Sequence, residues 1–90
     1  MELYWREVRR GQRLVLGDGE HEEEIGGVRE NKGLFDAFAK TFSYEPGRAE
    51  KGLASMEIAK SFVESFEPWN LYEGGDNLSV SSEIRPRVVE

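Results

Sequence analysis

Alternating apolar and polar residues predict short strands in the first part of the chain. Leu3–Val8 places Leu3 and Trp5 on one side of a pleat, and Arg13–Gly17 is a second run around an apolar centre. The segment between the two runs is polar and contains Gly11, which is typical of a hairpin turn. We therefore expect antiparallel strands over about residues 3–8 and 13–17.

A third strand is expected over about residues 24–30, after a turn at Asp18-Gly19. Every second residue from Glu20 to Glu24 would place a carboxylate on the same face, and like charges repel. Ordered pairing is therefore predicted to begin near Glu24, with the acidic run before it as a mobile loop or frayed edge. The consecutive glycines Gly26-Gly27 indicate a bulge or a close backbone approach.

Residues 34–42 fit either a strand or a helix. Leu34, Phe38 and Phe42 lie at helical spacing, yet they also fall on one face of a strand. The flanking turns at Asn31–Gly33 and Tyr44–Gly47 and the shortness of the run favour a strand.

An amphipathic helix is predicted over about residues 56–66. Ser55 suits the N-cap, and Glu67-Pro68 ends the element. The apolar stripe comprises Ala59, Phe62, Val63 and Phe66 and is widened by Ile58, while Glu57, Lys60, Ser61, Glu64 and Ser65 form the polar face. Residues 48–52 are interpreted as a polar connection that carries at most a loose turn of helix.

The order of these elements predicts an α+β fold: an antiparallel sheet of three to four strands packed by one helix. Residues 1–72 form a single domain in this interpretation, and residues 73–90 form a C-terminal tail, an edge strand or a flexible segment. The rhythm of Trp5, Gly26-Gly27-Val28, Phe35–Phe38 and Ser55–Lys60 resembles small phage and prophage proteins of unknown function. The resemblance implies a curled sheet covered by one helix, supports a strand at residues 34–42, and brings no catalytic residues with it.

Composition excludes several classes of protein. The 90 residues contain no cysteine, which rules out disulfides, thiolate zinc sites and thiol catalysis. Met1–Arg10 is interrupted by charges, unlike a secretory signal, and no apolar run approaches the length of a membrane helix. We expect a cytoplasmic protein, in the host cell if the chain is phage-encoded, with no membrane partner.

The acidic run is the first candidate site. Its carboxylates, with His21, do not follow a metal-ligand spacing, and adjacent strand residues point in opposite directions, so no metal site is expected. The sequence suggests instead a surface that docks on a basic partner protein, with nearby aromatic residues adding affinity. The predicted partner-binding residues are Asp18, Glu20, Glu22, Glu23, Glu24, Trp69 and Tyr72.

Catalysis is not expected, and neither is a cofactor. Asp36 could pair with Glu45 or Glu64 for acid–base catalysis, but the sequence gives no sign of a cleft that would perturb the pKa of either carboxylate. Ser55 is better explained as a helix cap than as a nucleophile. Gly26-Gly27 lacks the further residues of a phosphate-binding loop.

An arginine group is the alternative site. Arg6, Arg9, Arg10 and Arg13 surround the first turn, and Trp5 and Tyr4 lie close in sequence. Such a group can contact phosphate and stack a base, although the net charge of −6 opposes binding to nucleic acid.

These patterns predict a small acidic, non-enzymatic protein-binding module. The specific hypothesis is a phage or mobile-element protein that occludes a basic surface of a host protein, as an inhibitor of a host defence would. The alternatives are a nucleic-acid-associated accessory protein that uses the arginine-rich hairpin, and a self-associating virion or assembly component. The segment Trp69–Tyr72 either closes the core or marks a contact surface, which leaves a homodimer open.

Overall fold

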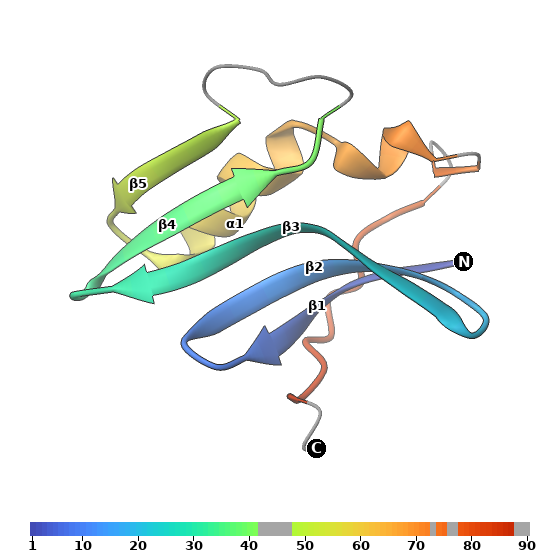
Figure 1. The fold of residues 1–90 in the computed structure, drawn as a ribbon, viewed down its shortest axis with the longest axis horizontal. Coiled ribbons are helices and arrows are strands. Elements are labelled where there is room, and N and C mark those ends of the chain that lie inside the picture. The colour runs from blue at the N-terminus through green and yellow to red at the C-terminus, as the bar shows by residue number, and fades with distance from the viewer. Residues whose placement is uncertain (42–47, 73, 76–77, 88–90) are drawn as a thin grey trace.

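The computed structural model describes residues 1–41, 48–72, 74–75 and 78–87. It confirms the predicted α+β class: one antiparallel sheet, with strands in the order β1-β2-β3-β4-β5, is packed by a single α-helix (Figure 1). The elements are β1 (Glu2–Val8), β2 (Gly11–Asp18), β3 (His21–Asn31), β4 (Leu34–Ala39), β5 (Ala49–Leu53), α1 (Met56–Ser65) and the 3₁₀ turn η1 (Pro68–Leu71).

Tight turns join the first four strands, so that consecutive strands become neighbours. Val8 pairs with Gly11 across the first turn, Asp18 with His21 across the second, and Asn31 with Leu34 across the third. In the third turn both central residues have positive φ, 54° at Lys32 and 81° at Gly33, which matches the right-handed twist of the strands.

Two predicted strand boundaries are wrong. β3 begins at His21 rather than near Glu24, because the acidic run is tied to its neighbours: Arg6 binds Glu22 and Lys40 binds Glu23. β2 begins at Gly11, where backbone pairing extends to the turn. The strand expected over residues 34–42 is present as Leu34–Ala39, and residue 42 and the turn at 44–47 lie outside the described residues.

The fifth strand was missed. The sequence predicts a polar connection over residues 48–52, yet Ala49–Leu53 pairs with β4. Its side chains are mostly exposed, so backbone hydrogen bonds to β4 hold the strand in place. Because no apolar side chains alternate along it, the sequence carries no strand pattern here.

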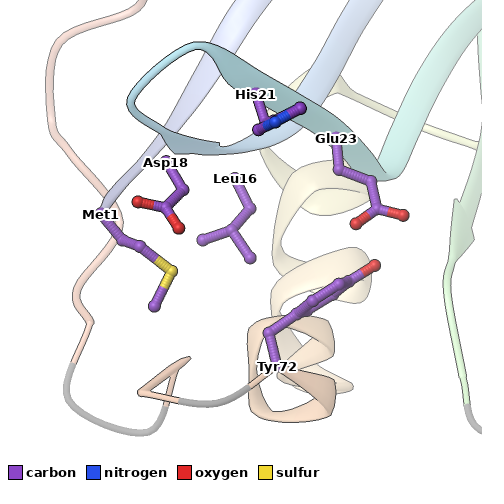
Figure 2. Close-up of a pocket in the computed structure, with 6 residues that line it drawn as sticks. All are labelled: Met1, Leu16, Asp18, His21, Glu23 and Tyr72. Carbon is purple, nitrogen blue, oxygen red and sulfur yellow. The ribbon is translucent and has the colours of Figure 1, made fainter.

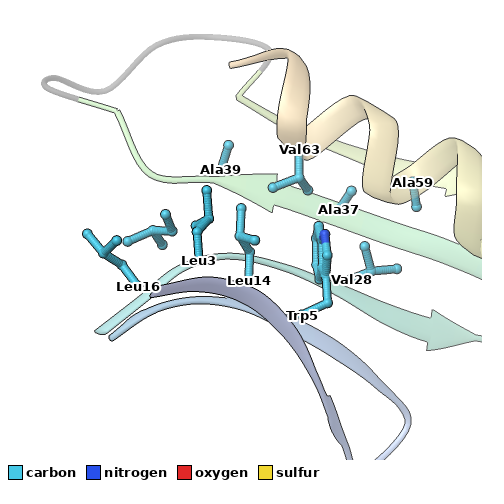
Figure 3. Close-up of a cluster of buried hydrophobic side chains, with 10 residues drawn as sticks. Leu3, Trp5, Leu14, Leu16, Val28, Ala37, Ala39, Ala59 and Val63 are labelled. Atoms are coloured by element: carbon cyan, nitrogen blue, oxygen red, sulfur yellow. The ribbon is translucent and has the colours of Figure 1, made fainter. Parts of the chain in front are cut away.

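A bulge in β3 curls the sheet. The register between β2 and β3 shifts between Leu14 and Val15, since Leu14 pairs with Gly26 and Val15 with Glu24. Ile25 is the extra residue and is fully buried. The inner face of the curl carries the core, which Figure 3 shows between the sheet and α1. The buried core consists of Leu3, Trp5, Leu14, Leu16, Ile25, Val28, Ala37, Ala39, Ala59 and Val63.

The helix is capped and placed as the sequence predicts, with one exception. The Ser55 hydroxyl accepts a hydrogen bond from the Ile58 amide at 3.1 Å, which confirms the N-cap. Ala59 and Val63 are buried against the sheet, whereas Ile58 is 51% exposed and does not widen the stripe. In the described residues, no helix is both long and apolar enough to cross a membrane.

Two residues expected on the polar face of α1 instead close the core around Trp5. Trp5 Nε1 donates a hydrogen bond to Glu64 at 3.0 Å, and Lys60 Nζ lies 5.1 Å from the centre of the Trp5 ring. Burial lowers the pKa of Lys60, while Glu64 and Glu57 oppose this effect. Lys60 and Glu64 are therefore half-buried rather than fully solvated.

The described part of the C-terminal tail lies along β1. Leu3 O accepts a hydrogen bond from the Ser81 amide at 2.8 Å, and Trp5 O accepts one from the Arg85 amide at 2.9 Å. In place of the edge strand that the sequence allows for this tail, the described residues form one isolated parallel bridge, between Arg6 and Arg85. The Arg85 guanidinium lies 3.7 Å from the centre of the Tyr4 ring and covers this residue, which is buried on the outer face of β1.

The contact between Gly26 and Val63 predicts a test of the packing. A Cβ at Gly26 would lie 2.4 Å from Val63 Cγ1, so Gly26→Ala forces the helix away from the sheet. We expect a loss of about 1–3 kcal/mol in the free energy of unfolding, measured by urea denaturation. Gly17→Ala is the matched control, since its Cβ would meet Tyr4 at 3.6 Å, an ordinary contact. Equal destabilisation of both variants would contradict this packing.

Candidate partner-binding pocket

A pocket of about 310 Å³ opens where the inner face of the sheet extends beyond α1 (Figure 2). Strand pairing positions its rim, because Leu16 lies opposite Glu23 and Asp18 lies opposite His21. Directly opposite residues share a face, so all four side chains project to the side that also carries the core. The pocket is lined by Met1, Leu16, Asp18, His21, Glu23 and Tyr72.

The segment after α1 supplies the far wall of the pocket. Glu67 has φ 47°, which turns the chain out of the helix, and the buried Pro68 opens η1. Tyr72 then packs against the core with its ring half-buried. In Figure 2, Asp18 and Glu23 lie on opposite sides of the opening, with Leu16 between them and Tyr72 below Glu23.

Lys40 fixes one side of the pocket. Its ammonium donates hydrogen bonds to the Tyr72 hydroxyl at 2.7 Å and to Glu23 Oε1 at 2.9 Å, and it lies 5.2 Å from the Tyr72 ring centre. These hydrogen bonds raise the pKa of Lys40, and the bond from Lys40 lowers the pKa of Glu23. Burial raises the pKa of Tyr72. Lys40 was not singled out from the sequence, because it is distant from Glu23 along the chain.

Asp18 provides the free charge of the pocket. Within the described ranges, its carboxylate has neither a hydrogen-bonding nor an ionic partner. His21 lies opposite it and is exposed. An incoming cation would therefore meet one unpaired carboxylate, at Asp18, and one that Lys40 already holds in place, at Glu23.

The other acidic residues point elsewhere. Glu22 accepts hydrogen bonds from the Tyr4 hydroxyl and from Arg6 Nη1, the latter at 2.9 Å, and these bonds lower the pKa of Glu22. Glu22 and Glu24 share the outer face of the sheet, and Glu20 lies in the turn. The acidic run therefore divides between two faces of one hairpin.

The two aromatic residues predicted from the sequence also separate. Tyr72 lines the pocket. Trp69 is half-buried and packs against the core cluster.

The predicted arginine group is also redistributed. Arg6 is engaged with Glu22. Arg9, Arg10 and Arg13 line a separate hollow together with Arg29. Arg29 was not predicted from the sequence to belong to this group. The pairing of Gly11 with Arg29 brings this residue beside the first turn, and strand register gives no local sequence signal.

The carboxylates considered for catalysis have structural partners. Asp36 accepts a hydrogen bond from the Gly52 amide at 3.1 Å, Glu64 binds Trp5, and Glu45 lies outside the described residues. In the described part of the chain, no three His, Asp or Glu residues are grouped so that they could hold a metal ion. No protein-family model, curated protein or solved structure matches this chain.

Removal of Lys40 should change the titration of Glu23. A neighbouring ammonium favours the charged carboxylate, so Lys40→Met should raise the pKa of Glu23 toward its ordinary value. Side-chain carboxyl NMR over an acid titration measures this shift. Lys32→Met is the control, because Lys32 lies in the turn at the opposite end of β3. An unchanged Glu23 pKa in Lys40→Met would contradict the assigned contact.

The hydrogen bonds to Glu22 predict acid sensitivity. Because the pKa of Glu22 in the folded state lies below its ordinary value of 4.5, these bonds stabilise the fold above that pH. The stabilisation is lost as pH falls through the lowered pKa. Glu22→Gln should therefore lose less stability than the parent between neutral and acidic pH, measured by urea denaturation at several pH values. An identical pH dependence in both proteins would rule out this role.

Proposed function

We propose that this protein is a non-enzymatic binding module that takes a basic side chain of a partner protein into the pocket below the β2–β3 hairpin. The observation that supports the proposal is the combination of an apolar floor with two carboxylates on the rim. Asp18, Glu23 and Tyr72, which the sequence singles out separately, line this one pocket.

The chemistry of the pocket suits an arginine or lysine side chain. Both residues carry an apolar stem that ends in a cation, and the stem can lie on Met1, Leu16 and the Tyr72 ring. The charged head can then bind the carboxylate of Asp18, while Glu23, which is already paired with Lys40, lies across the opening. Charge-assisted hydrogen bonds of this kind are roughly twice as strong as neutral ones.

The rigidity of the hairpin supports binding. Asp18 and Glu23 lie on paired strands rather than on a mobile loop, so little conformational entropy is lost when a partner docks. Glu20 in the turn and Glu24 on the outer face are both exposed and add to the negative charge of this hairpin. This charge accelerates association with a basic surface.

The partner class that follows is a protein with a basic surface, and the mode of action is occlusion of that surface. A host protein that normally binds nucleic acid would present such a surface. In the phage interpretation the module acts in the host cytoplasm as an inhibitor of a defence protein.

The test is capture of a partner from nuclease-treated lysate by the immobilised protein. The variant carries Asp18→Asn with Glu23→Gln, and the control carries Glu30→Gln with Glu50→Gln, which makes the same change in charge at exposed positions outside the pocket. We expect the pocket variant to bind the captured partner with an affinity lower by about tenfold or more, since hydrogen bonds to charged groups contribute roughly 1.5–3 kcal/mol. Equal capture by all three proteins would contradict the proposal.

The opposite charges at the two ends of the sheet favour a second candidate, head-to-tail self-association. An arginine of one copy would enter the pocket of the next copy. Light scattering distinguishes this candidate, because the mass would rise with concentration and would fall to that of a monomer in both Asp18→Asn and Arg9→Gln. A constant monomer mass in the parent protein rejects it.

A further inference from the structure

Four arginines line one hollow of about 420 Å³ at the end of the sheet opposite the acidic pocket. The β1–β2 turn supplies Arg9 and Arg10, and Arg13 follows on β2. Register places Arg29 of β3 opposite Gly11, beside that turn. Since β2 has 8 residues, the two ends lie about 24 Å apart, and a ligand here does not reach the acidic pocket.

The arginines are available to a ligand. Within the described ranges, the side chains of Arg9, Arg10 and Arg29 have no hydrogen-bonding or ionic partner, and all three residues are exposed. Arg13 donates only long hydrogen bonds, at 3.4 Å to Gln12 O and at 3.5 Å to Val28 O. Guanidinium groups with free donors are strong ligands for phosphate, which they can bind in a bidentate manner.

A groove that holds an exposed aromatic ring continues from this hollow. Arg13 and Arg29 line both sites, and the groove of about 300 Å³ also includes Phe38. Phe38 is 39% exposed, and the Arg13 guanidinium lies 5.6 Å from the centre of its ring. Gly27 pairs with Phe38, and the absence of a side chain there leaves room for Arg13 and the ring on the outer face.

We propose that this surface binds single-stranded nucleic acid, with a phosphate in the arginine hollow and the adjoining base on Phe38. Base stacking on an aromatic ring is tolerant of sequence, and arginine beside the ring adds a cation–π contribution. A single strand fits better than a duplex because its bases are free to stack. The net charge of −6 also opposes the wide phosphate surface of a duplex, so the contact is short and local.

The experiment is fluorescence anisotropy with a labelled single-stranded oligonucleotide at low salt. The parent protein should bind it, and Arg29→Gln should weaken binding by about tenfold, as expected for loss of one charge-assisted phosphate contact. Arg87→Gln makes the same charge change on the exposed tail and should bind as the parent does. Loss of one phosphate contact should also reduce the salt slope by about 0.7. Absence of binding, or equal losses in both variants, would overturn the proposal.

A Phe38 variant and two further ligands test the stacking of a base on Phe38 and the preference for a strand. Phe38→Leu should weaken oligonucleotide binding by about fivefold or more, since stacking on an aromatic ring contributes roughly 1–3 kcal/mol per base. The same variant should leave binding of inorganic polyphosphate unchanged. Equal effects on both ligands would overturn the stacking contact. Binding of a free mononucleotide as tight as that of the oligonucleotide would overturn the assignment to a strand.

Discussion

A short helix packed on a glycine organises this molecule. Val63 of α1 lies against Gly26, where any side chain would push the helix away. The helix has 10 residues and spans about 15 Å, whereas the 11 residues of β3 span about 36 Å. One helix cannot cover such a sheet, so the bulge at Ile25 curls the strands around the core and their ends extend beyond it (Figure 3).

The uncovered ends carry the charge. Tight turns return each strand beside its predecessor, so the β1–β2 turn brings Arg9 and Arg10 close to Arg29, and the β2–β3 turn brings Asp18 and Glu23 together. Ion pairs from Arg6 to Glu22 and from Lys40 to Glu23 neutralise part of the acidic charge and hold the β2–β3 hairpin in place. What remains is an acidic pocket at one end and a cationic hollow at the other, on a single small sheet.

Local pattern was sufficient for most of the fold. Period-two alternation and turn residues located the first strands, and Ser55 located the helix. β5 was missed because backbone pairing alone holds it, and β3 was shortened because the partners of Glu22 and Glu23 are distant in sequence. Asp18, Glu23 and Tyr72 were among the binding residues predicted from the sequence. Their contacts with the other residues around the pocket depend on strand register and on η1, which local pattern does not reveal; these are Met1, Leu16 and Lys40.

The most direct test of the pocket is an NMR titration with a short peptide that contains one arginine, against the same peptide with citrulline in its place. The account predicts that the arginine peptide shifts the backbone amides of Leu16, His21 and Glu23 and leaves that of Arg29 unmoved. The citrulline peptide, which keeps the shape and lacks the charge, should have a much smaller effect. Equal shifts with both peptides, or shifts confined to Glu22 and Glu24 on the outer face, would contradict a pocket that binds a basic side chain.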